Sequence, residues 1–215
     1  MNLSANCIGD HAAIDLFKSV QSQQNLQALI MDSNSLTDAC CPELSKAIES
    51  LNSLKLLSLH WNAIRYSILH RGFGGIEIIN AVKENFTIRV LDLGWNSLGT
   101  FRSKQFADTL AKLFNEENLL HIDISHNGLD FESCSIIAKS LTENHTLIGI
   151  HIDGNYCKID SKGFVIPTQS VQAEPSSLLN SRMQSKPKSK VPNVSSKCWI
   201  CEGWSNAMFT WDNSN

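Results

Sequence analysis

The sequence has no strong excess of either charge and no long apolar run. Its 215 residues include 18 Lys and Arg against 21 Asp and Glu, so the net charge is −3 and the pI is about 6.1. This balance gives no electrostatic reason to expect nucleic acid or a membrane surface as a partner. No apolar run approaches the roughly 18 residues of a membrane span, and no signal peptide is visible at the amino end.

A disulfide framework and a catalytic motif are also missing. The seven cysteines are odd in number, and Cys40 and Cys41 are adjacent, which predicts a reduced, cytoplasmic setting. The chain has no G-x-S-x-G sequence, no phosphate-binding loop and no Cys–His pair at a known family spacing. We therefore expect a protein that is not an enzyme and needs no cofactor.

What the sequence does contain is a repeat marked by asparagine. Each asparagine ends a short apolar phrase such as Leu54-x-x-Leu57-x-Leu59-x-x-Asn62, and successive copies lie 28 to 34 residues apart. A period of this length is typical of a stacked array. The asparagine side chain carries a donor and an acceptor, so it can bond backbone groups of neighbouring turns. The six positions are Asn6, Asn34, Asn62, Asn96, Asn127 and Asn155.

Each repeat reads as a short strand followed by a helix. Around Ile122 and Ile124, alternation predicts a strand with these two side chains inward. Helices with one apolar face are expected after each asparagine. The apolar stripes are Ile14/Phe17/Val20, Leu44/Ala47/Ile48/Leu51, Ile76/Ile79/Val82, Phe106/Leu110/Leu113 and Cys134/Ile137/Ala138/Leu141. The predicted helix caps are Asp10, Asp38, Ser103 and Asp130.

The phrase L-x-x-L-x-L-x-x-N-x-L, with a full helix in each unit, resembles the ribonuclease-inhibitor type of leucine-rich repeat. This type is also found in NOD-like receptors and in Ran GTPase-activating proteins, and the resemblance covers roughly residues 1–160. It implies an α/β solenoid, a horseshoe segment with a parallel sheet on the concave face and helices on the convex face. The Ran resemblance implies an alternative function, activation of a small GTPase through a loop arginine, here Arg65.

The outward positions of the concave sheet are the predicted binding surface for a protein partner. Trp61 and Trp95 fall on neighbouring strands and are predicted to lie side by side, either as partner anchors or packed on each other or under the 65–71 loop. The polar residues expected around them are His60, Asp92, His121, Asp123, His126 and His151.

A metal site among the His and Asp residues of this face is the alternative to a polar binding patch. The group in question is His121, Asp123, His126, His151 and Asp153. We expect these side chains to project in parallel rather than converge, so the prediction is a binding patch without metal. The oligomeric state is not indicated by the sequence.

Two departures from a regular array stand out. Residues Leu3–Ile8 already form the second half of a repeat phrase, so we expect a fragment of a longer array, a divergent gene product, or a protein whose amino edge meets a partner. The third interval is six residues longer than the shortest one, 34 against 28, and the extra residues fall in 65–71. A tolerated loop expansion is favoured over a binding loop.

The pattern predicts three parts: a repeat domain over 1–166, a Ser-, Pro- and Lys-rich disordered linker over 167–197, and a short aromatic segment over 198–215. Cys198 and Cys201 in the last part resemble a Cys-Trp-x-Cys-x-x-Trp element that follows repeats in some protist proteins. Zinc binding and redox activity are alternatives for this pair, and simple packing is favoured because no further ligand pair follows.

Overall fold

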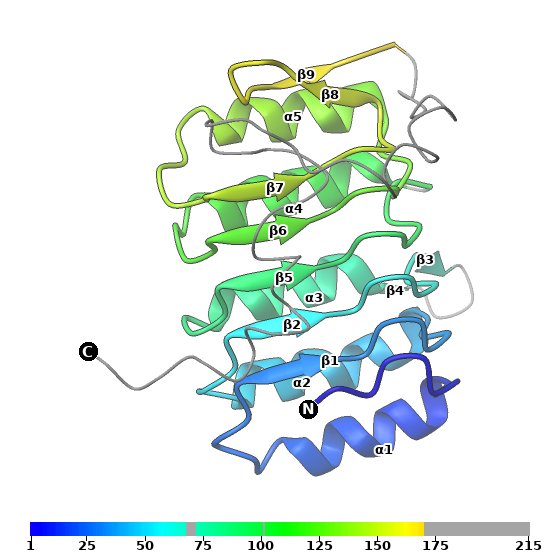
Figure 1. The fold of residues 1–215 in the computed structure, drawn as a ribbon. Coiled ribbons are helices and arrows are strands. Elements are labelled where there is room, and N and C mark those ends of the chain that lie inside the picture. Colours follow the sequence, from blue (N-terminus) through cyan, green and yellow to red (C-terminus); the bar gives the residue numbers. More distant parts are fainter. Residues whose placement is uncertain (68–71, 101, 170–215) are drawn as a thin grey trace, which may run out of the picture.

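The computed structural model describes residues 1–67, 72–100 and 102–169. Its centre is a five-stranded parallel sheet in the order β1-β2-β5-β6-β7 (Figure 1). The α/β fold with a parallel sheet is therefore confirmed, and each strand pairs with the previous one along the chain. The strands are β1 (Ala28–Ile30), β2 (Leu56–Ser58), β5 (Val90–Asp92), β6 (His121–Asp123) and β7 (Gly149–His151).

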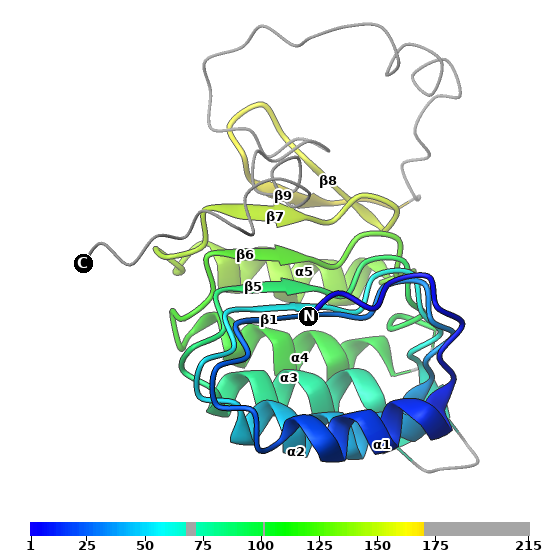
Figure 2. The ribbon, with the colours of Figure 1, turned by 60° about the horizontal axis from the view of Figure 1, so that its bottom comes forward.

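The helices that connect these strands lie together on one face of the sheet (Figure 2). Within the described residues no helix covers the opposite face, and none is long and apolar enough to cross a bilayer. Parallel neighbours need such crossovers, so the alternation of strand and helix sets the layer arrangement. The helices are α1 (Asp10–Val20), the 3₁₀ turn η1 (Asp38–Cys40), α2 (Cys41–Ser50), α3 (Gly74–Glu84), α4 (Ser103–Phe114) and α5 (Phe131–Leu141).

The core lies between the sheet and the helices. The inward strand positions are fully buried, as alternation predicts for Ile122 and Ile124. The predicted stripes of α2 and α4 are also buried. In α1 and α3 the buried face is rotated by one residue, with Ala13 and Ile78 in the core while Ile14 and Ile76 are only partly covered.

The asparagine ladder joins successive coils of the chain. Asn127 is 1% exposed; its Nδ2 donates to Leu93 O of the previous coil at 2.9 Å, and its Oδ1 accepts from Leu98 N at 3.2 Å. Asn34, Asn62, Asn96 and Asn155 likewise donate to the previous coil and accept from it. Asn6, in the first coil, is exposed, and its side chain donates only to carbonyls of its own coil. The predicted role is thus confirmed at five positions.

The residue before each asparagine adopts a left-handed backbone conformation. The φ values lie between 52° and 75°, although only one of the six residues is glycine. This conformation costs a residue with a side chain about 1–2 kcal/mol, so its recurrence shows that the ladder imposes it. The residues are Ala5, Ser33, Trp61, Trp95, His126 and Gly154.

Of the predicted caps, only Asp130 is confirmed, accepting from Ser133 N at 2.8 Å at the start of α5. Asp10 is the first residue of α1 and instead accepts from Thr37 N at 2.7 Å. Thr37 caps η1, which places Asp38 inside that turn. Ser103 begins α4, and its hydroxyl lies 2.6 Å from the Ser133 hydroxyl. Three predicted caps are therefore wrong: the Asp10 and Ser103 side chains bond adjacent coils, and Thr37 takes the place predicted for Asp38.

Two antiparallel hairpins complete the described chain. The inserted residues form β3 (Tyr66–Ser67), which pairs with β4 (Gly72–Phe73), so the predicted loop expansion is an ordered hairpin in part. β8 (Cys157–Ile159) pairs with β9 (Val165–Pro167) beside α5. The predicted linker beyond Gln169, the 198–215 segment, Cys198 and Cys201 lie outside the described residues.

Replacing Asn127 by Ala is expected to lower the free energy of unfolding by about 2–4 kcal/mol, because several buried backbone groups lose their partner at once. Asn6→Ala is the matched control, since the exposed Asn6 side chain bonds only its own coil, and we expect it to cost under about 1 kcal/mol. Urea unfolding followed by circular dichroism measures both. Equal losses in the two variants would contradict a stabilising role for the inter-coil bonds.

Candidate functional site

The candidate site lies on the helix-free face of the sheet, where the strands end. Two groups of side chains meet there. We call Trp61, Trp95 and His126 the aromatic row, and we call His60, Asp92 and Asp123 the acidic notch. The aromatic row is built by equivalent positions of successive coils, as are Asp92 and Asp123, because the parallel register brings such positions side by side. His60 lies two residues further along its own coil.

The aromatic row is a continuous stack. The ring centroids of Trp61 and Trp95 are 5.1 Å apart with an interplanar angle of 25°, and those of Trp95 and His126 are 3.9 Å apart at 18°. All three residues have the left-handed backbone that precedes a ladder asparagine, which aims their side chains alike. A Cβ atom at Gly154 would lie 2.3 Å from His126 Nδ1, so glycine makes room for the last ring.

The tryptophans stay accessible although they stack. Trp61 is 59% exposed and Trp95 is 41% exposed. The prediction that they lie side by side is confirmed, and the alternative that they pack on each other holds as well. The sequence did not indicate that His126 would extend the stack, although its place just before Asn127 is the available signal. Whether these rings anchor a partner stays a prediction.

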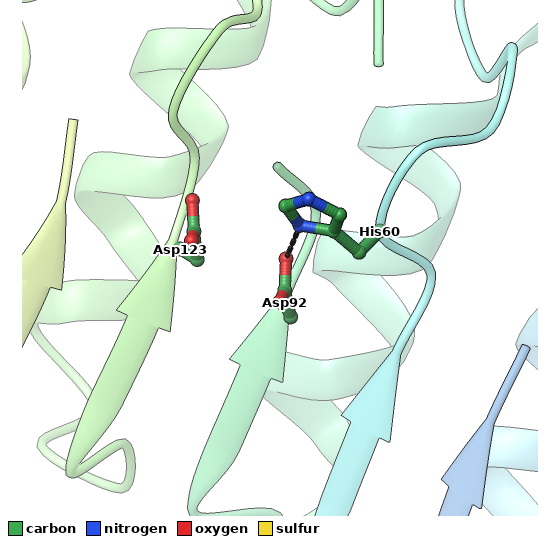
Figure 3. Close-up of side chains that lie close together, drawn as sticks. All are labelled: His60, Asp92 and Asp123. Carbon is green, nitrogen blue, oxygen red and sulfur yellow. Dashed lines mark hydrogen bonds and ion pairs between the residues drawn. The ribbon is translucent and has the colours of Figure 1, made fainter. Parts of the chain in front are cut away.

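The acidic notch brings together side chains from three neighbouring coils (Figure 3). His60 Nδ1 lies 3.0 Å from Asp92 Oδ1, which also accepts from Gly94 N at 2.9 Å. On the next strand Asp123 Oδ1 accepts from Ser125 N at 2.8 Å. One ligand atom from each of His60, Asp92 and Asp123 lies within 4.8 Å of the others. Of the residues weighed from the sequence as a metal site, this group contains only Asp123; His60 and Asp92 were not among them.

Burial and mutual charge shift the protonation of the notch. Burial lowers the pKa of His60, but the hydrogen bond to Asp92 and the nearby charges outweigh it, so the net shift is upward. Burial raises the pKa of Asp92; the His60 hydrogen bond opposes this and the negative Asp123 adds to it.

Asp32, on the coil before His60, supports the notch from one side. Its Oδ1 accepts from His60 N at 3.1 Å and from the Ser58 hydroxyl. Burial raises the pKa of Asp32, and these two hydrogen bonds oppose the shift. Sequence reasoning placed Asp32 on the outward face without a role. Its distance of two residues before the asparagine, matching His60 in the next coil, is the signal for it.

The remaining predicted residues are placed differently. His121 is fully buried and His151 is 8% exposed, with their ring centroids 5.0 Å apart. Asp92 and Asp123 are only 6% and 9% exposed. These outward side chains thus reach solvent less than the register predicted, because neighbouring strands are only about 4.8 Å apart and crowd them. Arg65 is exposed just before β3, and its role in GTPase regulation stays a prediction.

Acidification from pH 6.5 to about 4 is expected to weaken the fold through His121. Burial and the charge of His151 lower the pKa of His121 to about 4, whereas Asp123 opposes the shift. The unfolded chain therefore binds a proton in this window that the folded chain does not, and stability falls as the pH falls.

The measurement is the free energy of unfolding against pH for the wild type, His121→Gln and His145→Gln. The first substitution should reduce the slope between pH 6.5 and 4 by at most about 1.4 kcal/mol per pH unit. The exposed His145 is the matched control and should leave the slope unchanged. An unaltered slope in His121→Gln would contradict the assignment of this loss of stability to His121.

Comparison with known proteins finds distant relatives of large size. No protein-family model matches the chain. It is 26% identical over 185 residues to the NACHT, LRR and PYD domains-containing protein 3 of Mus musculus. In Dictyostelium discoideum it is 27% identical over 156 residues to the Rho GTPase-activating protein gacW and 24% identical over 148 residues to Protein CARMIL.

These matches cover 72%, 72% and 68% of this chain but only 17%, 11% and 13% of the relatives. The chain therefore spans less than a fifth of the length of each relative. The first relative carries the term LRR in its name, and the α/β fold with a five-stranded parallel sheet is compatible with that architecture. The relatives are consistent with a regulatory or interaction role.

Proposed function

We propose that residues 1–166 are a leucine-rich-repeat solenoid of the ribonuclease-inhibitor-like type that binds a protein partner on its concave face, without catalysis. The repeated strand, asparagine and helix support the solenoid, since every inner coil makes the same ladder contacts. The similarity to a protein named for its LRR points the same way. Such arrays bind partners across the surface that their strands present.

The exposed aromatic row carries the binding proposal. Two adjacent tryptophans at 59% and 41% exposure, on a face that no described helix covers, leave a large apolar area in water. Tryptophan is among the residues that contribute most to binding energy in interfaces. The stack with His126 holds the rings in place before a partner arrives, so little side-chain entropy is lost on binding.

The polar residues beside the aromatic row define the edge of the proposed contact surface. His60 belongs to the notch, and its ring centroid lies 6.3 Å from that of Trp61, with the two ring planes nearly perpendicular. The buried acids beyond it are poor contact residues, because a partner reaches little of their surface. We therefore place the anchors at Trp61 and Trp95 and the contacting rim at His60 and His126.

Truncating both tryptophans to Ala should weaken partner binding by at least about 2 kcal/mol, which is about thirtyfold in affinity. The matched control is Phe131→Ala, because Phe131 is 42% exposed, like Trp95, but begins α5 on the helical side. Proteins captured by the wild-type chain are identified, and their affinities for the three chains are measured by surface plasmon resonance. Circular dichroism checks that each variant is folded.

The control separates a specific surface from general stickiness. Loss of the same partners with Phe131→Ala would show that exposed aromatic area alone caused the capture. Retention of every wild-type partner by the double tryptophan variant would remove the concave face as the binding surface.

A further inference from the structure

The acidic notch is arranged around Gly94, two residues past the end of β5, where no side chain projects. His60 and Asp123 come from the coils on either side of Gly94, and both lean across it. A Cβ atom at Gly94 would lie 2.7 Å from Asp123 Oδ1 and 2.8 Å from His60 Nδ1, so a side chain there would force these two groups to shift. The gap is thus a direct result of glycine at the position where the neighbouring coils carry His60 and Ser125.

Two carboxylates face this gap from buried positions. Asp92 and Asp123 are 6% and 9% exposed, and Asp92 lies beside His60 at its edge. Asp123 accepts the Ser125 N–H, and its charge acts on the nearby imidazoles of His60 and His121. Two buried acids share the single imidazole of the notch, and buried negative charge is costly, so the notch attracts a cation.

We propose that the acidic notch binds one divalent transition-metal ion through His60, Asp92 and Asp123. One imidazole and two carboxylates are ligands that Zn²⁺ and its neighbours accept, whereas Mg²⁺ and Ca²⁺ favour oxygen ligands alone. Three protein ligands leave room for water on the open side of the sheet.

The geometry needs only a small adjustment. Ligand atoms bound tetrahedrally at about 2.0–2.2 Å to one ion lie about 3.3–3.6 Å apart, which is roughly 1.2–1.5 Å less than the 4.8 Å span found here. A rotation of one carboxylate closes that difference, and the missing side chain at Gly94 leaves space for it. Binding through His60 Nδ1 breaks its hydrogen bond with Asp92, and a proton carried on that nitrogen passes to solvent.

The first test measures stoichiometry on the full chain after chelator treatment. Isothermal titration with Zn²⁺, and the visible spectrum with Co²⁺, should reveal one equivalent whose spectrum lacks thiolate charge-transfer bands, because no cysteine belongs to the notch. Asp92→Asn combined with Asp123→Asn should weaken that equivalent by about a hundredfold or more, since it removes ligands rather than their supports. Mg²⁺ should not compete.

Two further variants separate a site from general attraction of cations. Gly94→Ala keeps every ligand but fills the gap, and it should weaken binding by about tenfold or more. Asp153→Asn removes an acid of the same face outside the notch and should leave binding unchanged. Equal binding by the wild type and Gly94→Ala, or equal weakening by Asp153→Asn, would overturn the proposal.

A measurement on the wild type alone covers the case in which the variants do not fold. Substoichiometric Mn²⁺ should broaden the indole N–H signal of Trp61 in nuclear magnetic resonance spectra, because its ring lies 6.3 Å from that of His60. Mg²⁺ should not have this effect. Absence of broadening at Trp61, together with no chelator-sensitive Zn²⁺ equivalent, would reject the site.

Discussion

The hydrogen bonds of the ladder asparagines are the constraint on which the rest of the structure depends. The side-chain amide of each inner asparagine both donates to and accepts from the backbone of the previous coil. Asn127, for example, donates to the Leu93 carbonyl and accepts from the Leu98 N–H. Aspartate lacks the donor, and alanine lacks both. Because the strands are only three residues long, their own ladder bonds are few, and the asparagines carry the pairing past the strand ends.

The ladder also decides what the open face displays. To reach the previous coil, the chain turns through a left-handed residue just before each asparagine. That turn fixes the direction of the side chain at this position in every coil, so Trp61, Trp95 and His126 stack without any contact from the core. The interior is thus uniform from coil to coil, whereas the outward positions are free to vary in chemistry. Binding specificity in such an array resides in those outward rows.

Much of this arrangement could be predicted from the repeat, because its period and the alternation of apolar residues can be read directly from the sequence. The ladder positions, the stripe of α2 and the adjacency of Trp61 and Trp95 follow from spacing alone. The helix starts did not follow, because Asp10 and Ser103 bond groups about 27 to 30 residues away. A local capping rule sees a suitable side chain but not the competing partner that the neighbouring coil supplies.

The convergence of the notch was hidden for a related reason. Alternation gives the face to which His60, Asp92 and Asp123 belong, but the lean of a side chain depends on what the adjacent coil places beside it. Gly94 is the deciding residue, and its importance appears only when the coils are laid side by side. Buried acids beside a row of outward positions that contains a glycine are therefore a stronger signal than the count of His and Asp residues on the face.

The notch and the aromatic row are also joined through the backbone. His60 and Trp61 are consecutive, and the left-handed turn at Trp61 sends their side chains to different groups. The His60 and Trp61 rings nevertheless stay close, with centroids 6.3 Å apart and ring planes nearly perpendicular. The notch and the aromatic row therefore adjoin at this point of the open face.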